Sequence, residues 1–446
     1  MSASLEELLR DDKVDLVLTR VEKDPSIIKE MAGLLTSDIR SVRFNATLAL
    51  GELGESASEA VPELAKRLED EDWSICRQAA RSLGKIGPSA AEAIPGLSKL
   101  LTDDEISIRK AAVISLGTIE TATDEAMDSL VTALGDKSEE IRTEAAKSLG
   151  KMGPSAHKRI PSLIEALKDT SWTVRTAAAQ SIKEIGTGSV EAIPTLVNTL
   201  EDDDWRVRHR ATETLGEIGD EAIPALLEAL NHDNPVVREG AIDTLGEMRV
   251  SDPRVVGSIG ALLNDRVERV RGKAADALSS IGKEAIPTLL DAYETSDSEM
   301  KVLIISAIGD IGQDAQDAIP ALIGILERDG KSERTEVARS LGKIGVGGED
   351  VIQALSRALN DSKVSVRREA ALGLGKLGQA ASDATPWLLQ ALADKKPDVR
   401  WRASEALGRI GAASSVVKTA LERLLHDEFD YVSEAAQEAL DLIGGD

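Results

Sequence analysis

Residues 70–102 read DEDWSICRQAARSLGKIGPSAAEAIPGLSKLLT, and this stretch carries the pattern of the whole chain. Apolar residues recur every three or four positions from Ile75 to Ile86, which predicts an amphipathic helix. Gly87 follows, the residue that best ends a helix in the left-handed conformation. After a short polar loop, Pro95 suits the first turn of a second helix, where its missing N–H costs nothing. The stretch therefore predicts two antiparallel helices, called helix A and helix B.

The same unit recurs at intervals of 33 residues along most of the chain. A basic residue early in each helix A marks the interval, and Cys76 replaces one of these markers. Two intervals, 208→238 and 271→301, are 30 residues long because the loop between helices A and B is three residues shorter. A fixed period of this length indicates a solenoid, in which each unit packs on its neighbours. The markers are Arg43, Arg109, Arg142, Arg175, Arg208, Arg238, Arg271, Lys301, Arg334, Arg367 and Arg400.

The composition is that of an acidic protein with an aliphatic core. Apolar residues make up 42% of the chain but aromatic residues only 2%, and the net charge is −25. Such a charge argues against binding to nucleic acid or to anionic membranes. No stretch approaches the length of a membrane span, and the N-terminus lacks the features of a signal peptide. The single cysteine excludes an intramolecular disulfide, so we expect a cytoplasmic protein.

A second ladder of residues accompanies the basic markers. An aspartate stands six residues before most of them, and a branched apolar residue stands immediately before most of them. An aspartate followed by Val-Arg or Ile-Arg early in helix A resembles the HEAT repeat, over roughly residues 37–444. The resemblance implies that aspartate and arginine of neighbouring repeats form a hydrogen-bonded ladder along the stack. The residues expected in this ladder include Arg109, Arg142, Arg175 and Arg208 with Asp103, Asp136, Asp169 and Asp202.

The fold prediction is an all-α solenoid, a right-handed superhelix of about a dozen two-helix repeats. Residues 1–36 are expected to form an N-terminal helical cap, residues 37–426 the tandem repeats, and residues 427–446 a C-terminal capping helix. The short period and the Ala-Ile-Pro start of helix B resemble more specifically the phycobilisome-lyase type of HEAT-like repeat.

Catalytic chemistry has little support in the sequence. The four histidines, His157, His209, His232 and His426, occupy different positions in their repeats, so stacking would not bring them together. Deoxyhypusine hydroxylase, built of similar repeats, binds iron through recurring His-Glu pairs, and no histidine here is followed by glutamate. Cys76 stands where other repeats carry the ladder arginine, and we expect it to be buried and unreactive. No catalytic residue, metal or cofactor is therefore expected.

The exposed face of helix B offers candidate binding residues. In HEAT solenoids this face lines the concave side, and here most of its positions are small. Trp387 is the exception, and Trp and Arg are frequent interface anchors. The candidates are Trp387, Arg357 and Arg423 near the C-terminal end, and the acidic residues Glu165, Glu228 and Asp291 in the middle of the row.

The sequence thus favours a non-catalytic scaffold or adaptor that binds a protein partner along the concave helix-B face. A first alternative, implied by the phycobilisome-lyase resemblance, is a bilin-lyase-like or chaperone-like accessory protein. A second is an oxidoreductase like deoxyhypusine hydroxylase, which the missing His-Glu pairs disfavour.

Overall fold

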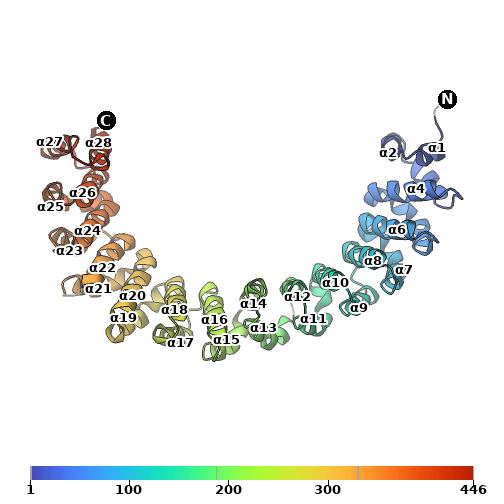
Figure 1. Ribbon diagram of the computed structural model, residues 1–446, viewed down its shortest axis with the longest axis horizontal. Coiled ribbons are helices and arrows are strands. Elements are labelled where there is room, and N and C mark those ends of the chain that lie inside the picture. Colours follow the sequence, from blue (N-terminus) through green and yellow to red (C-terminus); the bar gives the residue numbers. More distant parts are fainter. Residues whose placement is uncertain (1–2, 187, 329–330, 445–446) are drawn as a thin grey trace. The chain divides into compact units, whose positions relative to one another are not determined.

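The computed structural model describes residues 3–186, 188–328 and 331–444. Across these residues the regular structure is entirely helical, and consecutive helices pair side by side through short turns (Figure 1). The predicted all-α solenoid is confirmed. Its contacts divide the chain into two compact units, Met1–Ala229 and Leu230–Asp446, and each is described by itself. In the described ranges no helix is both long and apolar enough to cross a membrane.

The first unit begins with three helices that precede the regular pairs: α1 (Leu5–Arg10), α2 (Val14–Lys23) and α3 (Ile27–Leu34). The A helices that follow are α4 (Arg40–Glu52), α6 (Trp73–Ile86), α8 (Ile106–Ile119), α10 (Glu139–Lys151), α12 (Trp172–Ile185) and α14 (Trp205–Ile218). Their B helices are α5 (Val61–Lys66), α7 (Ile94–Leu100), α9 (Asp124–Ala133), α11 (Ile160–Ala166), α13 (Ile193–Thr199) and α15 (Ile223–Ala229).

The second unit continues the same alternation. Its A helices are α16 (Pro235–Glu247), α18 (Glu268–Ile281), α20 (Ser298–Asp310), α22 (Lys331–Ile344), α24 (Val364–Leu377), α26 (Pro397–Ile410) and α28 (Asp430–Gly444). Its B helices are α17 (Pro253–Ala261), α19 (Ile286–Thr295), α21 (Ile319–Leu326), α23 (Glu349–Ala358), α25 (Thr385–Ala391) and α27 (Ser415–Leu424). The boundaries expected for the two caps, at residues 36 and 427, stay predictions.

Short 3-10 segments join helices or extend their ends. They are η1 (Gly54–Ala60), η2 (Arg67–Glu69), η3 (Gly87–Ala93), η4 (Gly153–Arg159), η5 (Ser189–Ala192), η6 (Gly219–Ala222), η7 (Leu262–Asn264), η8 (Lys283–Ala285), η9 (Gly312–Ala318) and η10 (Gly378–Ala384).

The turn after helix A requires a left-handed backbone. The glycines that end the A helices have φ values from 55° to 97°. Glu120 (φ 50°) and Arg249 (φ 51°) stand at the same place in the repeat and adopt the same conformation. The turn therefore imposes this conformation even where a Cβ makes it unfavourable. The glycines are Gly54, Gly87, Gly153, Gly186, Gly219, Gly282, Gly312, Gly345, Gly378 and Gly411.

Neighbouring A helices approach each other at a second set of glycines, inside the helices. A Cβ added to Gly342 in α22 would lie 2.6 Å from the Cα of Gly373 in α24. A Cβ on Gly84 in α6 would lie 2.6 Å from Ser115 Oγ in α8. Because real Cβ atoms do not come this close, glycine is required for the observed spacing.

A serine or threonine usually faces the glycine and bonds the previous A helix. Its hydroxyl donates to a backbone carbonyl 35 residues earlier, as in Ser115 Oγ to Ala80 O at 2.7 Å. Sequence reasoning missed this contact, although Ser-Leu-Gly stands at the same place in four repeats, at 82–84, 115–117, 148–150 and 340–342. The same bond is made by Ser82, Ser148, Ser181, Thr214 and Ser340.

The A helices form the inner side of each unit. Within Met1–Ala229, and separately within Leu230–Asp446, the stack bends so that the A helices lie inside the arc and the B helices outside (Figure 1). The expectation that helix B lines the concave side is therefore wrong for each unit. The reason is that glycines draw the A helices together, while the B helices pack less closely on each other.

The glycine contact can be tested in the second unit. Replacing Gly342 by alanine should lower the free energy of unfolding by about 1–3 kcal/mol, because a backbone atom occupies the space that the methyl group needs. The matched control is Gly272→Ala in α18, where nothing lies within 4 Å. The free energy of unfolding of this control should rise by about 0.5–1 kcal/mol, because alanine has a higher helix propensity than glycine. Urea unfolding of the two variants measures both values, and equal stabilities would contradict the close-approach argument.

Candidate partner-binding surfaces

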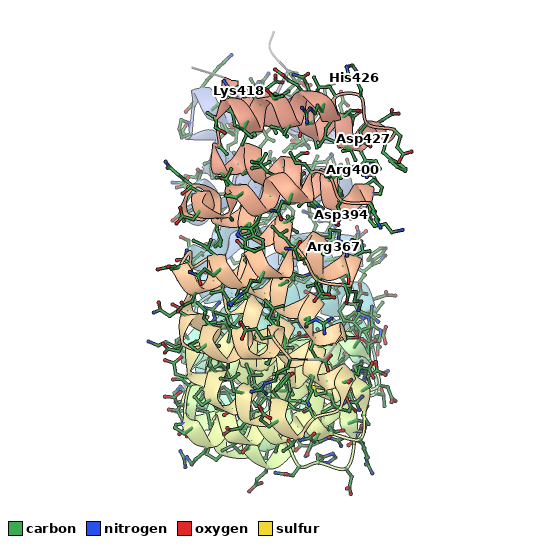
Figure 2. The ribbon with its side chains drawn as sticks, turned by 90° about the vertical axis from the view of Figure 1, so that its left-hand side faces the viewer. Arg367, Asp394, Arg400, Lys418, His426 and Asp427 are labelled. Carbon is green, nitrogen blue, oxygen red and sulfur yellow. The ribbon has the colours of Figure 1, made fainter. Side chains whose placement is uncertain are left out.

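Arginine–aspartate pairs join successive repeats near the start of helix A. Arg175 illustrates the geometry: Nε and Nη2 donate to the two carboxylate oxygens of Asp202, at 2.6 and 2.7 Å. Its third nitrogen, Nη1, donates to the carbonyl oxygen of Asp169 at 2.8 Å. Figure 2 shows Arg367, Asp394, Arg400 and Asp427 one above another along one edge of the second unit. The pairs are Arg43–Asp70, Arg109–Asp136, Arg142–Asp169, Arg175–Asp202, Arg238–Asp265, Arg334–Asp361, Arg367–Asp394 and Arg400–Asp427.

Each ladder aspartate also orders the turn in which it lies. Asp169 Oδ1 accepts the backbone N–H of Ser171 at 2.8 Å, two residues along the chain. The hydrogen bonds from Arg142 lower the pKa of the Asp169 carboxyl group, although its burial acts in the opposite direction. Arg400 lowers the pKa of Asp427 in the same way. The ladder is therefore formed by ionised carboxylates.

Two of the expected ladder residues have no ladder partner of opposite charge. Arg208 donates to the carbonyl oxygens of Asp202 (2.7 Å) and Asp203 (3.1 Å), with no carboxylate in ion-pair range among the described residues. Asp103 Oδ1 accepts the backbone N–H of Glu105 at 2.8 Å, and Cys76 occupies the place of its arginine. Cys76 is buried, and its burial, with Asp103 and Asp70 nearby, raises its pKa to about 11.

The candidate residues on the B helices lie on the outer side of their units. Arg357, Trp387 and Arg423 come from three successive B helices, α23, α25 and α27. The Trp387 side chain is 38% exposed and has no hydrogen bond or ring contact with any described residue. Arg357 Nη2 pairs with Glu327 at 3.0 Å, and Arg423 is exposed.

The acidic candidates are spread over both units. Glu165 in α11 pairs with Lys168 at 2.9 Å, and Glu228 in α15 is exposed. Asp291 in α19 is also exposed but belongs to the second unit. The structure therefore gathers the basic and aromatic candidates on neighbouring helices of one unit, whereas the acidic candidates form no single cluster within a unit.

The histidines occupy separate elements, as expected. His157 Nδ1 lies 3.1 Å from the carbonyl oxygen of Pro154, and His232 Nδ1 accepts the backbone N–H of Asn234 at 3.1 Å. Within the parts of the chain described, no three histidine, cysteine, aspartate or glutamate side chains are grouped as a metal site.

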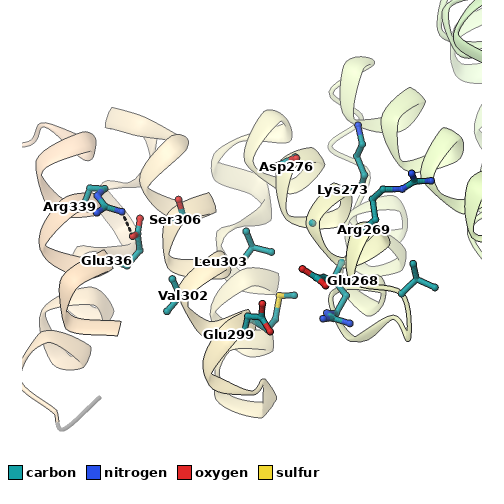
Figure 3. A pocket seen from close by; sticks show the side chains of 14 residues that line it. Glu268, Arg269, Lys273, Asp276, Glu299, Val302, Leu303, Ser306, Glu336 and Arg339 are labelled. Carbon is teal, nitrogen blue, oxygen red and sulfur yellow. Dashed lines mark hydrogen bonds and ion pairs between the residues drawn. The ribbon is translucent and has the colours of Figure 1, made fainter. Parts of the chain in front are cut away.

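An open cavity of about 820 Å³ lies on the inner side of the second unit, between α18, α20 and α22. Sequence reasoning missed it because it searched the exposed face of helix B. Met300, Val302 and Leu303 of α20 provide its apolar lining. Figure 3 shows Val302 on the side of α20 toward Glu336 and Arg339, and Leu303 on the side toward α18.

The basic residues around this cavity are mostly neutralised by carboxylates. Arg269 Nε lies 2.7 Å from Glu239, and Lys273 Nζ lies 3.0 Å from Asp243, both on α16. Arg339 Nη1 pairs with Glu336 at 2.5 Å, and its Nε lies 3.3 Å from Glu369. In Figure 3 the side chains of Arg269 and Lys273 extend away from the gap.

The carboxylates of the cavity are largely unpaired. Glu268, Asp276 and Glu299 are exposed and form no ion pair with the described residues. Glu268 and Glu299 extend into the gap between α18 and α20 (Figure 3). Arg271 is a lining cation without a carboxylate partner in the same residues, so the unpaired charge is predominantly negative.

The cavity forms where two contacts that join neighbouring A helices elsewhere are missing: the close approach at a glycine and the arginine–aspartate pair. Ser279 of α18 replaces the glycine that permits close approach elsewhere. The interval from Arg271 to Lys301 is 30 residues, and the ladder position six residues before Lys301 is Thr295, so the ladder carboxylate is absent and Arg271 donates only to Asp265 O, at 3.2 Å. Because neither the glycine contact nor the arginine–aspartate pair is present, α18 and α20 leave an open space between them.

Comparison with known proteins assigns the repeats to a family. A family model described as HEAT repeats matches residues 16–83, 31–117, 94–183, 160–245, 223–308, 286–372 and 357–441. The match covers HEAT repeats as a whole, so the resemblance to the phycobilisome-lyase type stays a prediction. No curated protein matches the sequence.

Solved karyopherin structures share the solenoid fold. Kap121p bound to Ste12p has a TM-score of 0.60 at 15% identity, over 94% of this chain and 53% of Kap121p. Kap121p bound to the extreme C-terminus of the protein phosphatase Cdc14p has a TM-score of 0.57 at 15% identity, over 96% and 51%. Kap95p, in a complex with RanGDP, has a TM-score of 0.51 at 16% identity, over 93% and 67%. This chain therefore spans about half the length of Kap121p.

Loss of one ladder arginine should weaken the stack locally. Arg175→Ala leaves the Asp202 carboxylate, whose side chain is only 10% exposed, without its guanidinium. We expect a local cost of about 2–4 kcal/mol, detected as faster amide hydrogen exchange in α12–α14 and little change elsewhere. Lys168→Ala is the control, because its ion pair with Glu165 is exposed and should contribute about 0–1 kcal/mol. Uniform exchange changes along the chain would refute local coupling.

The ladder should also make stability depend on pH in the acid range. The pKa values of Asp169 and Asp427 are lower in the folded chain than in the unfolded chain, so the ladder stabilises the fold above the unfolded value of about 3.9. That stabilisation should be lost progressively as the pH falls below about 4. Urea midpoints measured between neutral and acid pH test this. Asp169→Asn should be less stable at neutral pH yet lose less on acidification; a steeper acid loss would contradict the assignment.

Proposed function

The chain belongs to the HEAT-repeat family, and we propose that it is a non-catalytic scaffold that holds a segment of a partner protein on the inner face of Leu230–Asp446. The segment carries an apolar side chain flanked by basic residues. The observation that carries this proposal is the cavity between α18, α20 and α22, with its apolar lining and unpaired carboxylates. The proposed surface is helix A, in place of the helix-B face favoured by the sequence.

The chemistry of the cavity selects this kind of segment. Met300, Val302 and Leu303 give an apolar side chain a surface on which to be buried, at roughly 25 cal/mol for each Å² removed from water. Glu268 and Glu299 stand beside that surface and attract lysine or arginine on either side of the apolar residue. The net charge of −25 adds a long-range attraction that accelerates association with a basic partner.

The structural relatives are consistent with a scaffold. Two of the Kap121p structures hold a bound partner, Ste12p in one and the extreme C-terminus of Cdc14p in the other. Their likeness to this chain lies in the fold, so partner binding by this chain, its partner and its cytoplasmic location are proposals.

The outer face around Trp387 is an alternative surface for the same function. Trp387 is half-exposed among helices whose corresponding positions are mostly small, and Arg357 and Arg423 lie on the neighbouring B helices. A partner bound there would leave the cavity of α18, α20 and α22 free. The two surfaces can therefore be separated by substitution.

Charge reversal should distinguish the two surfaces. The probe is a fluorescent peptide with one leucine flanked by lysines, titrated in 150 mM salt. The double variant Glu268→Lys/Glu299→Lys should bind the peptide with an affinity reduced by roughly tenfold or more, because two attractive carboxylates are replaced by repulsive ammonium groups. The matched control, Glu165→Lys/Glu228→Lys, makes the same change in net charge on the outer side of the first unit. Equal losses in both would show that only the overall charge matters and would refute the site.

Trp387→Ala belongs in the same titration, with circular dichroism as the folding control. If the inner face binds the peptide, Trp387→Ala should bind normally. Weakening by about 2 kcal/mol or more with an unchanged melting curve would instead place the interaction on the outer face. Early melting with normal binding would show that the tryptophan stabilises the fold.

A further inference from the structure

The ladder of the first unit has one repeat without its cation. Cys76 stands 33 residues after Arg43 and 33 before Arg109. By the spacing that joins Arg109 to Asp136, an arginine at position 76 would bond Asp103. Instead Cys76 Sγ donates to Leu68 O at 3.1 Å, and no cation of the described residues forms an ion pair with the Asp103 carboxylate.

The other groups that hold a ladder arginine, a carboxylate and two turn carbonyls, are in place around Cys76. Asp72 N donates to Asp70 Oδ1 at 3.0 Å, and Glu105 N donates to Asp103 Oδ1 at 2.8 Å, as in the repeats that have a complete arginine–aspartate pair. In the next repeat Arg109 Nη1 donates to two successive turn carbonyls. The corresponding carbonyl oxygens, of Asp70 and Glu71, accept no side-chain hydrogen bond from the described residues. A carboxylate and two carbonyls therefore keep the arrangement that binds a guanidinium elsewhere in this chain.

A cavity of about 570 Å³ opens at this place. Its lining includes Asp70, Glu71, Cys76 and Asp103, together with Trp73, whose side chain is 52% exposed. The arginine that the other repeats place here would fill part of this volume. Because cysteine is much shorter than arginine, the cavity is the expected result of the replacement.

We propose that this cavity binds a guanidinium group supplied by an arginine side chain of a partner protein. A guanidinium is planar and presents a fork of N–H groups that matches a carboxylate and neighbouring carbonyls at once. Seven ladder pairs in the described chain, from Arg109–Asp136 to Arg400–Asp427, join the guanidinium to both carboxylate oxygens in this way. An ammonium group, a compact charge on a flexible stem, cannot reproduce the bidentate contact.

No cation of the described residues forms an ion pair with the Asp103 carboxylate, and the basic residues near the cavity have other contacts. Arg43 is paired with Asp70, Lys99 with Glu69 at 2.7 Å, and Arg109 with Asp136. The guanidinium of Arg77 lies over the Trp73 ring, 4.9 Å from its centroid, so the proposed guanidinium comes from outside the unit. At the mouth, Glu71 is 91% exposed in its side chain and Glu105 is exposed without an ion pair in the described residues. This acidic rim favours an arginine within a polypeptide, which lacks the α-carboxylate of the free amino acid.

The test is a thermal-shift titration of the full chain with N-acetyl-arginine-N-methylamide, in the millimolar range and at constant ionic strength. The wild-type protein and Cys76→Ala should show a saturable rise in melting temperature, because the ligand binds only the folded chain. Asp103→Asn keeps the acceptor for Glu105 N but removes the charge. Its affinity for the arginine probe should fall by roughly tenfold or more. Cys76→Arg should melt higher than wild type without ligand and should not respond to the ligand.

Two matched ligands complete the experiment. The lysine analogue of the probe carries the same charge and should give no saturable shift. Equal responses to both probes, or a response of Cys76→Arg like that of wild type, would overturn the guanidinium site. Free L-arginine should bind more weakly than the capped probe; equal binding would assign the site to a small guanidino compound and overturn the partner-protein source.

Discussion

The close approach of neighbouring A helices is the constraint on which the structure depends. Glycine at one helix position, as in Gly84 or Gly342, removes the Cβ that would otherwise meet the next helix. Opposite Gly84 and Gly309, the hydroxyl groups of Ser115 and Ser340 donate to a backbone carbonyl of the preceding helix, which joins the two helices directly. Close approaches are fewer between the B helices, where Gly96 and Gly260 face the side-chain ends of Leu68 and Thr288, and each unit bends toward its A helices. The curvature thus follows from a difference in spacing between the two layers.

The arginine–aspartate ladder fixes the turns between repeats. Each paired arginine bonds a carboxylate of the following repeat and a carbonyl of its own, as Arg175 does, so one side chain sets the spacing of two turns. Bidentate pairs of this kind have a defined geometry as well as a favourable energy. A regular ladder therefore reinforces, at the helix starts, the spacing that the glycines set farther along the A helices.

The cavity beside Cys76 and the cavity between α18, α20 and α22 both occur where the repeat pattern is broken. Between α18 and α20 the ladder lacks a carboxylate, because Thr295 occupies its position, and Ser279 replaces the contact glycine. At Cys76 the ladder lacks the cation, and the unpaired group is the Asp103 carboxylate. In a repeat protein the functional differences are found by comparing each repeat with its neighbours, because the chain supplies its own reference for every position.

The sequence by itself determined the period, the two-helix unit, the places where helix A ends and the pairing pattern of the ladder. These are local or nearest-neighbour properties: glycine is needed for a positive φ, and a basic residue recurs at fixed distance from an aspartate. Even Glu120 and Arg249, which break the glycine pattern, follow the backbone that their position requires. The breaks at Cys76, Ser279 and Thr295 are also present in the sequence.

Only the tertiary structure decided which layer lies inside the arc and what the breaks in the pattern produce. Curvature is the sum of small differences in spacing between packed helices, and those spacings depend on contacts that no single repeat contains. For this reason Trp387 and its neighbouring arginines, identified correctly as exposed or partly exposed residues of helix B, lie on the outer side rather than the inner side. The cavities have the same origin, because a missing side chain leaves open space only when the surrounding helices hold their positions.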